Sequence, residues 1–285
     1  MKRLKIGGVP EHFNLPWRLA IEEGKFKEAG IELHWSDMTG GTGQMIKGLQ
    51  AGSIDIAVLL TEGISRAILK GLDAKIIAVY VQTPLIWGIH APVNHGINTL
   101  NDLDGKTFAI SREGSGSHLM SFVLAQQQGW DPSSLSFNVV GDVYGGLWAL
   151  SSDEAQGFLW EKYTTQPFVD QGKCKRLGEV ITPWPCFVIA VRSETLQEEA
   201  RLLKSILPIV QARARELKNS ADAAEVIAWR YALKKNEVKQ WLNKTEWSQQ
   251  LSVSIKDFEQ VISTLGNLDL LSEEEIQDWQ QKLFV

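Results

Sequence analysis

The chain has 285 residues, of which 44% are hydrophobic and 22% charged, a composition typical of globular proteins and a length that suits two linked α/β lobes. Its net charge of -5 argues against nucleic-acid binding, which needs a basic face, and against an anionic membrane surface as partner. Two cysteines, Cys174 and Cys186, are too few for a disulfide scaffold or a four-ligand zinc site.

The first third of the chain alternates strand and helix patterns. The apolar run 54–60 is typical of a strand buried on both faces, and Pro16 suits the first turn of a helix that Gly30 ends. We expect a β-α-β-α-β unit with a parallel sheet and helices on both sides. The predicted strands are 4–9, 31–38, 54–60 and 74–81, and the predicted helices are 16–29, 45–51 and 61–70.

A second unit begins near Asn98 and repeats this alternation. The segments 51–57 and 152–158 each precede a strand and a loop with a glutamate, Glu62 or Glu161, which supports two similarly built lobes. After a short helical turn at 100–105, the predicted strands are 106–110, 135–140, 156–160, 174–180 and 187–191, and the predicted helices are 118–128, 144–150 and 161–171.

The sequence becomes helical after Ser193. Ser272 and Glu275 have the spacing of a capping box at a helix start. Because no glycine- or proline-rich linker separates this tail, we expect it to pack on the first lobe. The predicted helices are 194–218, 220–234, 236–245, 254–265 and 272–283. Lobe 1 is predicted to comprise 1–90 and 190–285, and lobe 2 to comprise 91–189. The chain is predicted to cross between the lobes near 82–92 and 182–190.

Four blocks of sequence, lying in order along the chain, resemble one known family. The blocks 19–33, 49–57 and 98–110 are similar to segments of alkanesulfonate-, nitrate- and taurine-type substrate-binding proteins, a family that includes relatives of thiamine-pyrimidine synthase. The block 160–163 resembles their Trp-Glu-Pro-Tyr element, with Lys162 in place of proline. The resemblance implies a two-lobed type II periplasmic-binding-protein fold of class α/β, with mainly parallel sheets, a ligand cleft between the lobes and delivery to an ABC permease.

The start of the chain bears on where the protein acts. Residues 1–10 lack the apolar run of about 7–15 residues that a signal peptide needs, and no run in the chain approaches the ~20 residues that span a bilayer. We therefore expect a cytoplasmic protein as the sequence stands, and a periplasmic one if a signal peptide has been removed.

The candidate site follows from the rule that open α/β sheets bind ligands at the carboxyl ends of their strands. The loop 111–118 has glycines and hydroxyls that suit an anion at a helix start, and Arg112 could pair with a carboxylate or sulfonate. Each such loop has a competing structural interpretation as a turn, a helix cap or a packed side chain. The predicted ligand-binding residues are Glu11, His12, Phe13, Thr39, Gly41, Thr42, Thr61, Glu62, Ser111, Arg112, Ser115, Gly116, Ser117, His118, Trp160 and Glu161.

The acidic members of this set decide the expected ligand. Glu11, Glu62 and Glu161 would repel a bare oxyanion, which favours an organic ligand with a nitrogen, zwitterionic or carrying a sulfonate or carboxylate. We expect non-catalytic binding by a monomer, with no cofactor and no metal. The expected partners are a small-molecule ligand and an ABC permease, with no nucleic acid and no insertion into a membrane.

Two other classes of function stay open. One is a cytosolic enzyme on the same fold, related to thiamine-pyrimidine synthase, since fold alone does not exclude catalysis. Such relatives need a cysteine-rich iron cluster, which two cysteines do not form, and a cofactor-bearing lysine, for which Lys162 is the one lysine beside a site element. Acid–base pairs would be His12 with Glu62 or His118 with Glu161.

The other class is a ligand sensor. Closure of two lobes on a ligand shifts a population that a partner protein can read. The docking face would then be the helical tail, whose tryptophans also fit ordinary core packing: Trp229, Trp241, Trp247 and Trp279.

Overall fold

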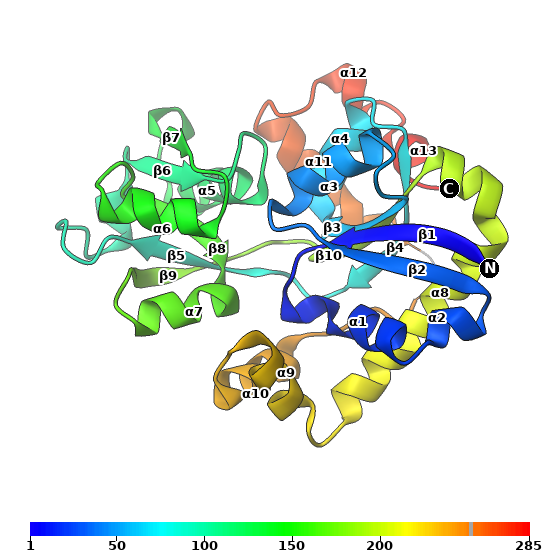
Figure 1. The fold of residues 1–285 in the computed structure, drawn as a ribbon. Coiled ribbons are helices and arrows are strands. Elements are labelled where there is room, and N and C mark those ends of the chain that lie inside the picture. Colours follow the sequence, from blue (N-terminus) through cyan, green and yellow to red (C-terminus); the bar gives the residue numbers. More distant parts are fainter. Residues whose placement is uncertain (251–252) are drawn as a thin grey trace. The chain divides into compact units, whose positions relative to one another are not determined.

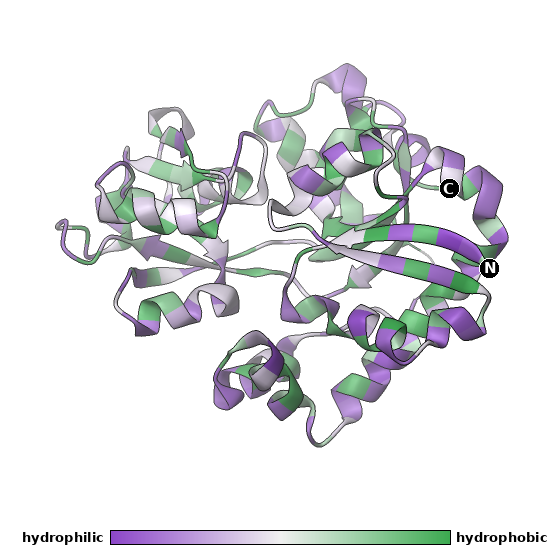
Figure 2. Cartoon of the chain, in the orientation of Figure 1, coloured by the Kyte–Doolittle hydropathy of each residue, from purple (hydrophilic) through white to green (hydrophobic). Residues whose placement is uncertain are grey.

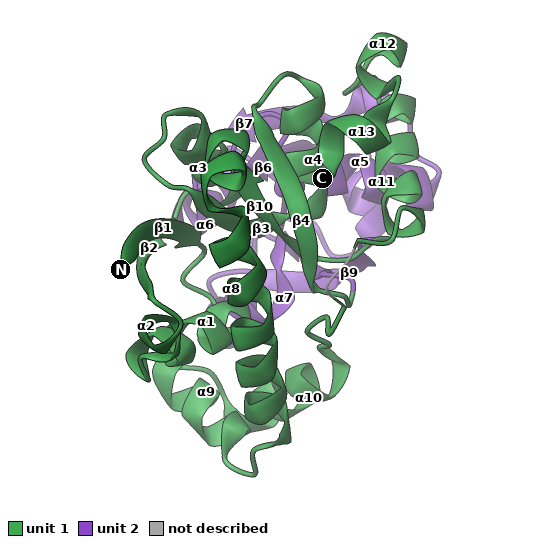
Figure 3. Cartoon of the chain, turned by 90° about the vertical axis from the view of Figure 1, so that its right-hand side faces the viewer, with its two compact units in different colours: residues 1–83, 183–285 green, residues 84–182 purple. Residues whose placement is uncertain are grey.

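The computed structural model describes residues 1–250 and 253–285, and contacts within it divide the chain into two compact units. Unit 1 consists of Met1–Thr83 and Pro183–Val285, and unit 2 of Pro84–Thr182 (Figure 3). The divisions fall a few residues before the expected 90 and 189. The reason is that β5 (Ile86–Ala91) hydrogen-bonds to strands of unit 2, whereas β10 (Phe187–Arg192) hydrogen-bonds to strands of unit 1.

Unit 1 is built around a five-stranded sheet with the order β2-β1-β3-β10-β4 (Figure 1). β1 (Lys2–Gly8) pairs in parallel with β2 (Ile31–Asp37) and β3 (Ile56–Leu60), and β10 runs antiparallel to β3 and to β4 (Ala74–Val81). Polar and apolar side chains alternate along the middle of β1, the pattern of a strand with one face in the core (Figure 2). Central β3 is instead an apolar run that is buried on both faces, as its sequence predicts.

The helices of unit 1 lie close to their predicted positions. One difference is that the helix predicted over 16–29 is divided at Gly24, whose φ of 76° is left-handed and interrupts the helical backbone. The observed elements are a 3-10 helix at His12–Asn14, α1 (Leu15–Glu22), α2 (Lys25–Glu28), α3 (Gly41–Gln50) and α4 (Thr61–Leu69).

Unit 2 repeats the layout of unit 1. Its sheet has the order β7-β6-β8-β5-β9, in which β6 pairs in parallel with β7 and β8, and β5 runs antiparallel to β8 and β9. The elements are β6 (Thr107–Ile110), β7 (Ser136–Val139), β8 (Gly157–Glu161) and β9 (Lys175–Ile181), with α5 (Gly116–Gln128), α6 (Val143–Ser151), α7 (Lys162–Asp170) and 3-10 helices at Leu100–Leu103 and Pro132–Ser134.

The α/β class is confirmed, and both sheets are mixed, where mainly parallel sheets were expected. Each sheet has two parallel and two antiparallel pairings. The antiparallel strand is in each case the one that follows a crossing, β5 in unit 2 and β10 in unit 1. The strand that follows a crossing from one unit to the other is not joined to its new sheet by a right-handed strand–helix–strand connection. That connection is what makes the other neighbouring strands parallel.

A shared hydrogen-bond pattern supports the internal repeat. In unit 1 the Asp55 carboxylate accepts a hydrogen bond from the Lys5 amide at 2.8 Å, and the Asp55 amide donates to the Lys5 carbonyl at 2.8 Å. In unit 2 the Gln156 side-chain oxygen accepts from the Thr107 amide at 3.3 Å, and the Gln156 amide donates to the Thr107 carbonyl at 2.8 Å. The same reciprocal pair of hydrogen bonds therefore joins β1 to the start of β3 and β6 to the start of β8.

The helical tail lies in unit 1, where α8 packs against α1 and against β10 and β4. The helix predicted over 272–283 is two short helices, separated by Asp278 with a φ of 54°, and the capping box of Ser272 and Glu275 is confirmed. None of the helices in the described part of the chain is long and apolar enough to cross a bilayer. The tail consists of α8 (Ser193–Asn219), α9 (Ala223–Tyr231), α10 (Lys235–Lys244), α11 (Lys256–Asn267), α12 (Glu273–Ile276) and α13 (Trp279–Leu283).

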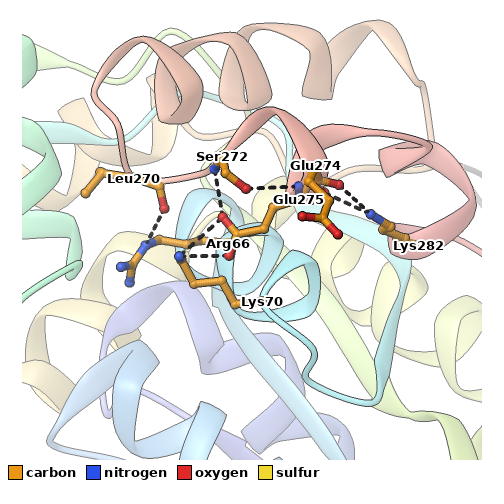
Figure 4. Close-up of polar contacts among 7 residues, drawn as sticks. All are labelled: Arg66, Lys70, Leu270, Ser272, Glu274, Glu275 and Lys282. Carbon is orange, nitrogen blue, oxygen red and sulfur yellow. Dashed lines mark hydrogen bonds and ion pairs between the residues drawn. The ribbon is translucent and has the colours of Figure 1, made fainter.

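Polar contacts tie the end of the tail to α4 (Figure 4). Lys70, the residue that follows α4, forms an ion pair with Glu275 at 3.0 Å, and Arg66 of α4 donates to the Leu270 carbonyl at 3.4 Å. Lys282 donates to the Glu275 carbonyl at 3.1 Å, so that α12 and α13 are held together. These contacts hold the C-terminal half of α4. Its first turn carries two of the predicted site residues, Thr61 and Glu62.

Candidate functional site

The carboxyl ends of β1, β2 and β3 bring eight predicted residues to one edge of the sheet in unit 1. These strands are parallel neighbours, so the loops that follow them emerge at the same edge. The residues are Glu11, His12 and Phe13 after β1, Thr39, Gly41 and Thr42 after β2, and Thr61 and Glu62 after β3.

The two threonines at the helix starts have structural partners. The Thr42 hydroxyl accepts a hydrogen bond from the Leu60 amide at 3.3 Å, which joins the first turn of α3 to the end of β3. The Thr61 hydroxyl is completely buried and donates to the carbonyl of Pro185 at 2.5 Å. A Cβ on Gly63 would lie 2.5 Å from the Thr42 methyl group, so only glycine fits where the first turns of α3 and α4 meet.

Glu62 is one of the buried polar side chains of unit 1 whose hydrogen bonding is incomplete among the described residues. It is 2% exposed, and its Oε2 accepts a hydrogen bond from Trp184 Nε1 at 2.9 Å. Its Oε1 is buried and receives no hydrogen bond from any described residue. Burial raises the pKa of the Glu62 carboxyl from 4.5 to about 7, against the lowering effect of its own amide and of the Trp184 indole. Glu62 therefore carries a carboxyl that changes charge near neutral pH.

The loop after β1 packs into an aromatic cluster. The His12 ring is 2% exposed, lies 4.3 Å from Trp241 and 4.9 Å from Phe13 between ring centroids, and leaves Nε2 without a hydrogen-bond partner among the described residues. Burial lowers the pKa of His12 from 6.5 to about 3, so that its ring is neutral at pH 7. Phe13 is 5.2 Å from Phe187, which leads into β10. A neutral, enclosed His12 is a packing residue in unit 1, and Glu11 remains half-buried beside it.

The second group of predicted residues lies at the start of α5 in unit 2. Ser115 caps the helix by accepting from the His118 amide at 3.4 Å, and Ser117 accepts from the Ser111 amide at 3.0 Å. His118 Nδ1 accepts from the Gly114 amide at 2.8 Å. These side chains shape the loop and leave the first-turn amides, at Gly116 and Ser117, without an intrahelical acceptor, as at every helix start. The loop can therefore offer backbone N–H groups and a partial positive charge to an anion.

Arg112 lies half-buried in the same loop. Burial lowers the pKa of its guanidinium, and an arginine nevertheless stays charged at neutral pH. A guanidinium forms strong hydrogen bonds with a carboxylate or sulfonate.

The end of β8 carries Trp160 and Glu161. Glu161 is 4% exposed and caps α7 through a 2.6 Å hydrogen bond from the Thr164 amide, while burial raises the pKa of its carboxyl despite that bond. Asp55 and Gln156 make the same pair of hydrogen bonds, so they are equivalent positions in the repeat. Glu161, five residues after Gln156, therefore corresponds to Leu60 in unit 1 and not to Glu62. The two glutamates are thus two positions apart in the repeat.

The residues that an enzyme would need are otherwise engaged. Lys162 forms an ion pair with Glu179 at 2.6 Å, which leaves it a poor candidate to bear a cofactor. Cys174 lies in unit 2 and Cys186 in unit 1, both buried as free thiols, and burial raises the pKa of Cys174 to about 11. Within residues 1–250 and 253–285, no three His, Cys, Asp or Glu side chains gather as metal ligands would.

Two residues at these strand ends were missed in the sequence. Trp184 comes from the second crossing, and nothing local indicates that its indole reaches Glu62. Asp142 follows β7 and caps α6, accepting from the amides of Tyr144 at 3.0 Å and Gly145 at 2.9 Å. Its place just before a helical run is an ordinary cap signal, which could have identified it.

Comparison with known proteins agrees with this fold. The family model of Ca3427-like PBPs matches residues 87–180, which is most of unit 2. No curated protein sequence matches the chain. The Candida albicans CA3427 gene product, described as having the generic periplasmic binding protein fold, superposes with a TM-score of 0.91 at 25% identity over 100% of this chain and 96% of that protein.

Two bacterial binding proteins share the fold at lower identity. The alkanesulfonate-binding protein SsuA from Xanthomonas axonopodis pv. citri, bound to MOPS, gives a TM-score of 0.80 at 15% identity over 97% of each chain. The nitrate-binding protein NrtA from Synechocystis PCC 6803 gives 0.68 at 15% identity over 99% of this chain and 89% of that one. The resemblance seen in the sequence is confirmed: the chain has the type II periplasmic-binding-protein fold.

Proposed function

We propose that the chain binds a small organic ligand without covalent chemistry, as the substrate-binding protein of an ABC-type transporter. The observation that carries this proposal is that two units of the same topology each gather parallel strand ends and helix starts at one sheet edge, and that buried polar groups lie there. Such edges are the usual ligand sites of open α/β sheets. An ABC permease would be the partner.

The charges of the two groups of residues favour a ligand of mixed chemistry. Unit 1 offers the buried Glu62 carboxyl, whereas unit 2 offers the α5 amides and Arg112. A bare oxyanion would be attracted by the second group and repelled by an ionised Glu62. The ligand we propose therefore carries a nitrogen together with a carboxylate or sulfonate, in contrast to the nitrate named for NrtA.

Catalysis is the less supported alternative. The Lys162 ammonium is paired with Glu179, and His12 is enclosed and neutral, so neither is poised as a nucleophile or a general base. The similar solved structures are named as binding proteins.

A thermal-stability screen tests the proposal. Amino-sulfonates and amino-carboxylates should raise the melting temperature of the full chain, while nitrate should not. A ligand at 100 times its Kd stabilises the folded state by about 2.7 kcal/mol, enough for a clear shift. Failure of every small molecule to stabilise the chain would refute binding, and stabilisation by nitrate alone would refute the proposed ligand class.

A further inference from the structure

Glu62 is held in place from two sides. Trp184, itself 2% exposed, fixes Oε2 from a segment in which prolines 183 and 185 restrict the backbone. Thr61, the preceding residue, donates to the Pro185 carbonyl and so pins the same segment to the first turn of α4. The carboxyl therefore has a fixed orientation, with one oxygen bonded and the other buried without a hydrogen-bond partner among the described residues.

An unbonded carboxyl oxygen in such a place is costly. A buried acceptor without a donor destabilises the folded state, and more so when it is charged. Buried polar groups are nearly always paired, and each exception calls for an explanation such as a functional role or an ordered water or ion. A glutamine or leucine at this position would fill the same space without the charge, so the carboxylate points to a donor that arrives from outside the chain.

We propose that Glu62 Oε1 accepts a hydrogen bond from a cationic N–H group of the ligand, a protonated amine or an amidinium, and that Trp184 orients it for that contact. This inference rests on the proposed function and names the group that the site selects. A cationic donor and an ionised carboxylate form a charge-assisted hydrogen bond, about twice as strong as a neutral one.

The test uses small aromatic probes that differ in charge. Benzamidinium, benzyl alcohol and benzoate are titrated into the full chain labelled with ¹⁵N at the tryptophan indoles, and the Trp184 resonance is followed. We expect benzamidinium to shift that resonance and to raise the melting temperature, and the other two probes to do neither. Because the Trp184 indole donates directly to Glu62, its shift reports the contact and not merely binding somewhere on the chain.

Variants separate recognition from folding. Glu62→Gln keeps the size of the side chain and should weaken benzamidinium binding roughly 10- to 150-fold, the range for a hydrogen bond to a charged group. Glu259→Gln removes an exposed carboxylate from the same unit and should leave binding unchanged. Trp184→Phe should weaken benzamidinium binding. The same variant should raise the pKa of the Glu62 carboxyl measured by pH titration, because the indole hydrogen bond that lowers this pKa is lost; a merely structural role for the indole would not produce this rise.

The outcomes distinguish this inference from the proposed function. Equal benzamidinium affinity in wild type and Glu62→Gln, or tighter binding of benzoate than of benzamidinium, would overturn the role of Glu62 and leave ligand binding standing. Absence of binding by any probe, together with a negative stability screen, would overturn both.

Discussion

The carboxyl of Glu62 should make the stability of the chain depend on pH in a direction opposite to that of most acidic residues. Burial raises its pKa from 4.5 to about 7, so the folded chain holds this proton more tightly than the unfolded chain does. The favourable contribution is complete below pH 4.5 and is lost as the pH rises through about 7. At about 1.4 kcal/mol per pKa unit, the loss amounts to about 3 kcal/mol.

The Glu62→Gln variant isolates this effect. Glutamine retains an acceptor for the Trp184 indole and has no proton to lose, so the variant should gain about 2–3 kcal/mol relative to wild type between pH 5 and pH 8. Urea unfolding at four pH values in this range measures the difference. Urea unfolding of Glu259→Gln, which changes an exposed carboxylate of the same unit, serves as the control. A constant difference for Glu62→Gln would refute the reasoning that this carboxyl is enclosed.

Three further predictions concern other residues. Arg112→Ala should weaken an anionic ligand by ~1.5–3 kcal/mol, measured by calorimetry, and unchanged affinity would place Arg112 outside the site. Ligand binding should quench or shift tryptophan fluorescence through Trp160, and a Trp160→Phe variant that kept the full change would contradict this. Gly63→Ala should destabilise the chain by roughly 1–3 kcal/mol through its clash with the Thr42 methyl, and Thr42→Ser should restore part of the loss in the double variant; additive losses in urea unfolding would show that the methyl is not the cause.

Most helices and strands could be predicted because they follow local rules. The buried run of β3 and the capping box at Ser272 each depend on a few neighbouring residues, and both are observed. β5 was missed, since Gly88 and His90 interrupt its apolar pattern and it serves as a strand only because β8 and β9 lie on either side. The mixed character of the sheets was missed for the same reason: the direction of a strand after a crossing is set by tertiary contacts.

The candidate site was predictable in position and less so in chemistry. The rule that ligands bind at the carboxyl ends of strands located the loops. It could not show that the hydroxyls of Ser115 and Ser117 accept hydrogen bonds from amides within the same loop. Likewise, the sequence gives Glu62 as one of several acidic residues. Only the structure shows that its partner is Trp184, which lies 122 positions away, and that one of its oxygens has no hydrogen-bond partner within residues 1–250 and 253–285.

The most direct test of the central claim is a mass spectrum of the small molecules released when the freshly purified chain is unfolded. The account predicts one organic species that contains nitrogen, present in a stoichiometric amount with wild type and depleted with Glu62→Gln. A spectrum without such a species from a chain that no amine-bearing probe stabilises, or a species attached covalently to a lysine, would contradict it.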